Sequence, residues 1–473
     1  MESWGSQNFA DCQLGDKRLN KRALEIGLAL VAGFGQALSI IFKEENLLKR
    51  AYEFLANPKA QFQELTQPHL KKTALVAATL PVVLAVGDTT YLDYKNIKVK
   101  RDGYGPIGNG GNGLILHTTL AVEPEQGQSL GLLWQKLMSR QPKAKPPANE
   151  TPKQKKVRQS RERKAARSKP FEEKESYRWV EALKAVEKQF QEVEKCSQPT
   201  QQPLQETSLF IGQQTRIIHI FDREGDIAEV FEQVRQMERT GVIVRAAHDR
   251  SLDSDTAHLW EHLSAKPIQF YQEVELPATA KRQARTAKLA VRFYPVQLRS
   301  PRRLKNQDPF EVYTVYAQEI DCPEGEEAVS WMLLTSESVP TVAKAVTILR
   351  WYTYRWHVEE YHKILKSGCQ VESYRLAATS MSALLGFLTV IAAELLRVTY
   401  LHRTQSSCGS YNNFVPSAAR CTESQVPELT KSVNCGLGSF GSSTVRRLSG
   451  TSTKNTDWYS GSLERLVEIG IPL

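Results

Sequence analysis

The stretch Trp351-Tyr-Thr-Tyr-Arg-Trp-His-Val-Glu-Glu-Tyr-His-Lys-Ile-Leu-Lys366 carries the most specific pattern in the chain. Its apolar residues recur at helical spacing, which predicts a long helix over about 341–366. At ~100° per residue, four side chains of different chemistry fall within roughly 60° of one another on that helix. They are Tyr352, Arg355, Glu359 and Lys366. A solvated face on which Glu359 simply pairs with Arg355 would have the same spacing.

Two apolar runs upstream each end on an acid. The runs from Val82 to Asp88 and from Arg216 to Asp222 are typical of buried strands. Ligands and chemistry gather at the carboxyl edge of an open α/β sheet, so Asp88 and Asp222 are candidate catalytic residues. Either aspartate taken alone fits a turn or capping residue equally well.

The remaining sequence divides by composition and periodicity into five segments. We expect a helical domain at 1–75, an α/β core at 76–250, a β-rich segment at 251–335, core helices at 336–402 and an atypical Ser/Cys-rich tail at 403–473. A basic insertion at about 140–170 shows no apolar period, which predicts disorder. The order predicts an α/β core interrupted by an all-β insertion.

The charge of the chain is concentrated in two places. The 473 residues carry a net charge of +10, but residues 136–169 alone hold thirteen Lys or Arg against two Glu, and residues 276–307 hold nine Lys or Arg and no acid. Local excesses of this size favour a polyanionic partner. The N-terminal segment adds a basic group that includes Lys17, Arg18 and Arg22, for which DNA contact and a solvated helix face both remain open.

Several classes of protein are disfavoured. The longest apolar run, from Leu384 to Leu396, is too short to span a bilayer, and Met1 is followed by Glu-Ser-Trp-Gly rather than a secretory signal. The seven cysteines are scattered and form no C-x-x-C pair, which argues against a disulfide framework or a zinc site. We expect a cytoplasmic protein without a membrane partner.

The motifs taken together resemble those of a known family. The pattern Tyr352-x2-Arg355-x3-Glu359-x6-Lys366, with Gly87-Asp-Thr-Thr90 and Phe221-Asp-Arg-Glu-Gly-Asp226, resembles the insertion-sequence 4 class of bacterial DDE transposases, which move DNA by cut-and-paste. Glu173-Lys-Glu-Ser176 with Trp179 is similar to the family core, and Leu14-Gly-Asp-Lys-Arg18 to its N-terminal DNA-binding module. The resemblance covers roughly residues 4 to 402.

The resemblance implies an RNase H-like catalytic core in which Asp88, Asp222 and Glu359 bind two Mg²⁺ or Mn²⁺ ions. Such a centre would cleave the transposon ends and transfer strands into target DNA, which places the protein with the bacterial nucleoid. Arg355 and Lys366 would hold DNA phosphates, and Tyr352 would hydrogen-bond to one. Trp331 takes the place of a tryptophan that stacks on a flipped base in a related transposase, although it fits an ordinary core position of its strand equally well.

The tail departs from the family pattern. A helical region that pairs two transposases as a homodimer in the synaptic complex is expected there, but the chain ends with Asn455-Thr-Asp-Trp-Tyr-Ser-Gly-Ser-Leu-Glu-Arg-Leu466. Codons that encode a family-like tail can yield this amino-acid sequence when they are read one base out of phase. We therefore interpret the tail as the product of a frameshift. The alternative function is then a catalytically silent or dimerisation-defective DNA-binding remnant.

Overall fold

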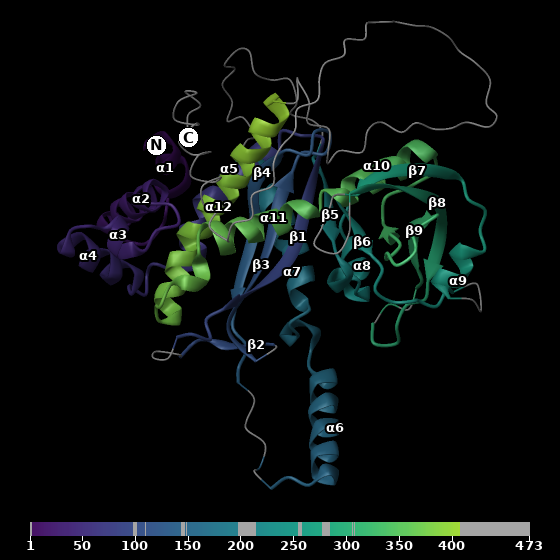
Figure 1. Cartoon of the computed structure of the whole chain (residues 1–473), viewed down its shortest axis with the longest axis horizontal. Helices are drawn as coiled ribbons and strands as arrows, with labels where there is room; N and C mark the ends of the chain where they lie inside the picture. The colour runs from purple at the N-terminus through teal and green to yellow at the C-terminus, as the bar shows by residue number, and fades with distance from the viewer. Residues whose placement is uncertain are drawn as a thin grey trace, which may run out of the picture.

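The computed structural model describes residues 2–97, 102–108, 110–142, 147, 149–196, 214–253, 258–276, 284–304, 306 and 308–406. The frameshift hypothesis concerns tail residues that lie outside these ranges. Parts of the two basic segments, 136–169 and 276–307, also lie outside them. Over the described residues the chain forms a mixed α/β fold built on one open sheet (Figure 1).

The ten strands found in the described residues join in that single sheet. They are β1 (Val82–Asp93), β2 (Gly105–Gly108), β3 (Gly111–Val122), β4 (Ser129–Met138), β5 (Arg216–Phe221), β6 (Thr240–Arg245), β7 (Phe270–Leu276), β8 (Arg285–Leu298), β9 (Phe310–Ile320) and β10 (Ser330–Thr335). The order is β2-β3-β1-β5-β6-β10-β9-β8-β7, with β4 also paired to β3. Among these ten, the parallel pairings are β1 with β5 and β5 with β6.

The segment 251–335 is less separate than the sequence predicts. Strand β10 pairs antiparallel with β6, for example Leu333 with Arg245, so β7 to β10 continue the core sheet. The segment also contains a short helix, α9 (Leu259–Ser264). The outer edge of β6 carries unpaired backbone groups that β10 satisfies, which explains the continuous sheet.

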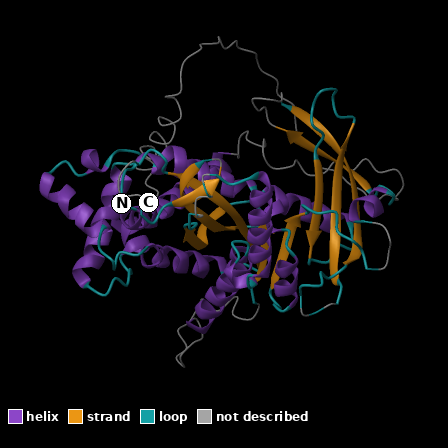
Figure 2. Ribbon diagram, turned by 90° about the horizontal axis from the view of Figure 1, so that it is seen from below, coloured by secondary structure: helices purple, strands orange, loops and turns teal. Residues whose placement is uncertain are grey.

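Helices cover both faces of the central strands (Figure 2). Besides α9, the α-helices in the described residues are α1 (Glu2–Phe9), α2 (Lys17–Ala32), α3 (Leu38–Ile41), α4 (Glu45–Leu55), α5 (Phe62–Ala77), α6 (Pro152–Ser168), α7 (Tyr177–Cys196), α8 (Ala228–Arg235), α10 (Val342–Thr353), α11 (Trp356–Lys363) and α12 (Ala378–Ser406). Val83 and Ala85 of β1 pack in one cluster with Val186 of α7. The alternate residue Leu84 packs in another cluster with α11 and α12.

The N-terminal helices are fastened to α12. The ring of Phe387 on α12 lies 5.2 Å from Phe9 of α1 and 6.0 Å from Phe54 of α4, centroid to centroid. Helix α12 is long and apolar enough to cross a membrane, but 89% of its apolar window is buried inside the molecule. It therefore acts as a core helix that joins the N-terminal helices to the sheet.

The prediction of one continuous helix over 341–366 is wrong. Helix α10 ends at Thr353, and the N–H groups of Arg355 and His357 bond to carbonyls three residues back, at 3.1 and 3.0 Å. This tight turn precedes α11, and a π-helical turn follows at Ile364–Gly368. Both irregularities rotate the residues that follow, so a single helical wheel does not hold for Tyr352 to Lys366.

The basic insertion is also not disordered throughout. Residues Pro152–Ser168 form α6, which projects away from the body of the molecule (Figure 1). A capping box between Thr151 and Gln154 starts the helix, and Pro152 occupies its first turn. Lys, Arg, Gln, Glu and Ala all favour helix, so α6 forms without an apolar face, and no residue in it is buried.

Candidate active site

The two candidate aspartates lie side by side where β5 ends. Asp222 follows β5 directly, whereas Asp88 lies within β1, which continues to Asp93, so the prediction that its strand ends on Asp88 is wrong. The parallel pairing runs from Val82↔Arg216 to Val86↔Ile220, and two further residues in this register bring Asp88 opposite Asp222. Side chains alternate along a strand, so Asp88 shares a face with Leu84 and Asp222 shares a face with Ile220. Leu84 and Ile220 pack with residues of α11 and α12, so both carboxylates face the helix that carries Glu359.

The pKa of Asp88 records this convergence. It is raised from 3.8 to about 7, mainly by burial and next by the charge of Asp222, with a smaller contribution from Glu359. The Thr89 N–H, which donates to Asp88 Oδ1 at 2.7 Å, and the Arg355 guanidinium act in the opposite direction. Three carboxyl groups from β1, the end of β5 and α11 therefore lie within electrostatic reach of one another.

Glu359 is engaged by a neighbour on its own helix. Arg355 Nη1 donates to Glu359 Oε1 at 2.8 Å, which is the i,i+4 pair that the sequence alternative describes. Across the described ranges, no three His, Cys, Asp or Glu side chains are already grouped closely enough to hold a metal ion. The donor set is nevertheless made of carboxylate oxygens, which suit Mg²⁺ and Mn²⁺, and a cation would offset the burial and the repulsion that raise the pKa of Asp88.

Tyr352 lies beside the same carboxylates. It is 5% exposed, and burial raises its pKa, while the charges of Arg355 and Arg245 oppose that rise. The Trp331 ring meets Tyr352 edge-on at 5.8 Å between centroids and is only partly buried. Trp331 therefore packs at the margin of the site, which leaves both of its sequence interpretations open.

Lys366 contacts β1 and the segment that follows α11. Its Nζ donates to the Tyr91 carbonyl on β1 at 2.7 Å and is 3.9 Å from Glu372. Lys366 lies within the π-helical turn Ile364–Gly368, and its contact with Tyr91 places it beside β1 beyond Asp88. Its predicted contact with phosphate would require these two protein contacts to loosen.

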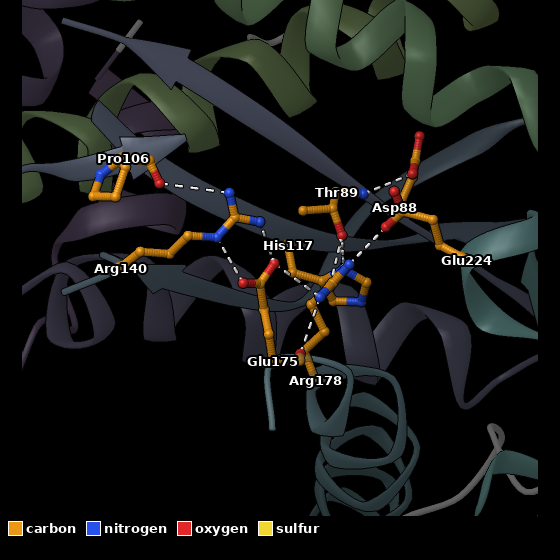
Figure 3. Close-up of polar contacts among 8 residues, drawn as sticks. All are labelled: Asp88, Thr89, Pro106, His117, Arg140, Glu175, Arg178 and Glu224. Carbon is orange, nitrogen blue, oxygen red and sulfur yellow. Dashed lines mark hydrogen bonds and ion pairs between the residues drawn. The ribbon is translucent and has the colours of Figure 1, made fainter. Parts of the chain in front are cut away.

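A buried arginine on α7 ties the two aspartate segments together (Figure 3). Arg178, 6% exposed, donates from Nε to Thr89 Oγ1 at 2.9 Å and from Nη2 to Glu224 Oε2 at 2.6 Å. Thr89 follows Asp88 directly, and the Glu224 N–H donates to Asp222 Oδ1 at 2.8 Å. One guanidinium on the far face of the sheet therefore holds the side chains of two residues that neighbour the carboxylates, Thr89 next to Asp88 and Glu224 two residues after Asp222.

The surroundings of Arg178 hold it in place. Its Nη1 donates to the Glu175 carbonyl at 3.0 Å, and the Glu175 carboxylate accepts two bonds from Arg140, each at 2.7 Å. Thr89 Oγ1 also lies 2.8 Å from Nδ1 of His117, a ring kept neutral because burial lowers its pKa well below the usual value. Arg178 was not singled out by sequence reasoning. Its only signal was its position beside Trp179 on an otherwise apolar helix face.

Two further residues were missed at the ends of the core strands. Asp226, 1% exposed, accepts the N–H groups of Ala247 and His248 at 2.8 and 3.1 Å and so fastens the turn after Asp222 to the end of β6. Arg245 on β6 is half-buried, and the charges of Arg223 and Arg355 help burial to lower its pKa. The sequence signal for Asp226 was its position at the end of the Asp-Arg-Glu-Gly-Asp motif. The signal for Arg245 was a basic residue at the end of an apolar strand.

The N-terminal basic residues belong to α2. Lys17 and Arg18 are exposed in its first turn, while Arg22 pairs with Glu25 at 3.0 Å. Positive charge near a helix N-terminus opposes the helix dipole, so Lys17 and Arg18 do not serve the stability of α2. Asp16 offsets them by capping the Arg18 N–H at 2.7 Å.

Comparison with known families adds one finding at this end of the chain. Residues 1–60 match a family model described as transposase DNA-binding. The matched region comprises α1 to α4 and includes Lys17, Arg18 and Arg22. The chain therefore carries an N-terminal transposase DNA-binding domain, which supports a transposase with DNA as its partner.

Proposed function

We propose that the chain is a DDE transposase of the insertion-sequence 4 class, with a catalytic centre formed by Asp88, Asp222 and Glu359. The observation that carries the proposal is the convergence of three carboxyl groups in a buried setting, recorded in the raised pKa of Asp88. Strongly perturbed carboxyl groups at the carboxyl edge of an open sheet are typical of catalytic sites.

The carboxylates of Asp88, Asp222 and Glu359 would hold two divalent cations. Bound Mg²⁺ or Mn²⁺ would lower the pKa of an attacking hydroxyl or water and stabilise the leaving oxygen of the phosphodiester. To bind a cation, Glu359 would give up the hydrogen bond that it accepts from Arg355, and the guanidinium would then be available to bind phosphate. The RNase H-like character of the core belongs to the same proposal and is supported by the parallel pairing of β1, β5 and β6.

The positive groups around the carboxylates suit a phosphodiester substrate. Arg355, Arg245 and Arg223 lie close enough for their charges to influence one another's pKa values or that of Tyr352. Guanidinium groups bind phosphate oxygens bidentately, and the Tyr352 hydroxyl can donate one further bond. We therefore assign Arg355 and Tyr352 to the scissile phosphates, and Trp331 to the adjoining base or to packing of Tyr352.

The test is cleavage of a duplex that carries the terminal repeat of the element that encodes the chain. We expect nicking at the repeat end that requires Mg²⁺ or Mn²⁺, and that falls by at least ~10³-fold in Asp88→Ala, Asp222→Ala or Glu359→Gln while DNA binding persists. Lys17→Gln with Arg18→Gln should weaken repeat binding without changing the metal requirement.

Other outcomes separate the rival functions. Repeat binding without nicking by the unmutated chain would favour the DNA-binding remnant. Equal cleavage of unrelated DNA would indicate a general nuclease. Nicking that persists in all three carboxylate variants would overturn the assignment of the centre. Single-end nicking without joined ends would indicate failure to form the synaptic homodimer.

A further inference from the structure

We infer that α6 is an arm that binds the phosphate backbone of duplex DNA through one basic face. Its seventeen residues carry eight Lys or Arg and one Glu, and none of them is buried. Figure 1 shows the helix extending away from the other elements. The inference deepens the proposed function and depends on it only in taking duplex DNA as the ligand.

The charges on α6 are arranged unevenly around the helix. At ~100° per residue, five basic side chains fall within roughly 100° of one another: Lys153, Lys156, Arg163, Lys164 and Arg167. None of these five has an ion-pair partner in the part of the chain that the structure describes. Arg158, on the opposite side, bonds to Glu150 and Glu162 at 2.7 Å. The helix therefore has a paired side and an unpaired basic face.

The basic face has the length of a DNA-binding surface. From Lys153 to Arg167 it extends for about 21 Å at the helical rise of ~1.5 Å per residue. Duplex DNA carries one negative charge per ~1.7 Å of its axis, so a phosphate lies within reach of each of the five side chains. A protein partner would need apolar anchors as well as charge, and α6 offers only Val157, which is exposed.

The root of the arm adjoins the candidate active site. Lys174 Nζ donates to the Arg167 carbonyl at 3.2 Å, and the Phe171 and Tyr177 rings meet edge-on at 5.6 Å. The next residue, Arg178, contacts Thr89 beside Asp88. The root of α6 is therefore linked through Arg178 to the strand that carries Asp88, from the face of the sheet opposite the carboxylates.

The test compares two triple variants of the full chain with identical changes in composition and charge. Lys156→Gln, Arg163→Gln and Arg167→Gln remove three of the five charges of the basic face, and Lys155→Gln, Arg158→Gln and Arg161→Gln remove charges elsewhere on α6. The slope of log Kobs against log salt is measured on a duplex of arbitrary sequence. We expect the slope to shrink by ~2.7 in the first variant, the value of three phosphates, and by less than ~0.9 in the second.

Each result decides the inference. An unchanged slope in the first variant overturns it, and equal reductions in both variants show a diffuse charge effect rather than a binding face. Circular dichroism should be the same for both variants, because Gln maintains helix. Metal-dependent nicking by the unmutated chain is measured separately. If that nicking is absent but the two variants still differ in slope, the result counts against the proposed function and still supports DNA binding by α6.

Discussion

At the scale of single residues, Asp88 couples the candidate centre to pH. Its pKa is raised from 3.8 to about 7, so the folded protein holds a proton that the unfolded chain releases between these pH values. Stability therefore falls as pH rises from about 4 to 7, and the full cost, roughly 4 kcal/mol, is present above pH 7. A cation bound to the carboxylates would reverse that cost.

The first prediction follows from this sign. Asp88→Asn should raise the free energy of unfolding by roughly 2–4 kcal/mol at pH 8 and change it little at pH 4. Millimolar Mg²⁺ should raise the melting temperature of the unmutated chain at pH 8 but not that of the variant. Urea unfolding at both pH values tests the first statement, and an equal gain at pH 4 and pH 8 would contradict it.

Arg178 gives a second prediction at the same scale. Arg178→Lys keeps the charge but cannot reach both Thr89 and Glu224, because a lysine offers one point charge instead of a fork. We expect nicking to need ~10–100-fold more metal, with DNA affinity unchanged. Arg140→Lys is the matched control, since Arg140 shares Glu175 with Arg178 but directs its remaining bond to the Pro106 carbonyl. The same metal requirement in both variants would show that Arg178 has only a structural role.

At the scale of elements, the sequence predicts the strands of the core well. It does not predict the break between α10 and α11 or the helix α6 within the basic insertion. Strands β1 and β5 begin at the predicted residues, Val82 and Arg216, because buried strands show directly as apolar runs. The turn at Tyr354 and Arg355 was missed because both residues keep right-handed helical angles, and only the hydrogen bonds change from four residues to three. Helix α6 was missed because its stability comes from capping and propensity rather than apolar period.

The candidate site was predictable where it depends on apolar strands, and not where it depends on contacts between distant segments. Asp88 and Asp222 could be found because apolar strands lead directly into them, and their alignment follows from the parallel register. The contacts of Lys366 could not be predicted, since they involve the π-helical turn and a Tyr91 carbonyl that is remote in sequence. Arg178 was equally hidden, because its partners come from two other segments.

The third prediction concerns the turn that supports the start of α11. Gly127 has φ +68°, and a Cβ there would lie 2.6 Å from the Tyr354 ring. Its carbonyl accepts a bond from His357 Nε2 at 2.7 Å. Gly127→Ala should therefore cost ~2–4 kcal/mol of stability and reduce nicking, because the clash displaces the helix that carries Glu359.

Gly325 provides the matched control for backbone strain. It has φ +82°, and among the described residues no atom lies within 4 Å of where a Cβ would be, so Gly325→Ala should cost only ~1 kcal/mol and leave nicking unchanged. Urea unfolding and the nicking rate are measured for both variants. Equal losses in the two would mean that the Tyr354 contact does not matter.

At the scale of the whole molecule, the DNA-binding helices and the sheet form one packed unit. His69 on α5 bonds through Nδ1 to Asn8 of α1 at 2.8 Å and accepts the Leu132 N–H of β4 through Nε2 at 3.1 Å. Lys72 on α5 also bonds to the buried Glu394 on α12 at 3.2 Å. The N-terminal helices therefore depend on the core for part of their packing.

The last prediction is that the whole molecule loses stability in mild acid. Burial lowers the pKa of five of the nine histidines, to about 4 for His69, to about 3 for His219 and His362, and in the same direction for His117 and His357. The unfolded chain binds these protons near pH 6.5, so the stabilisation is complete above that pH and is lost as pH falls towards 4. Asp88 acts oppositely, but it is one group against five. His69→Gln should flatten the fall by up to roughly 3 kcal/mol between pH 6.5 and 4, measured by urea unfolding. A fall as steep as that of the unmutated chain would show that His69 is not protonated on unfolding, despite its contacts with α1 and β4.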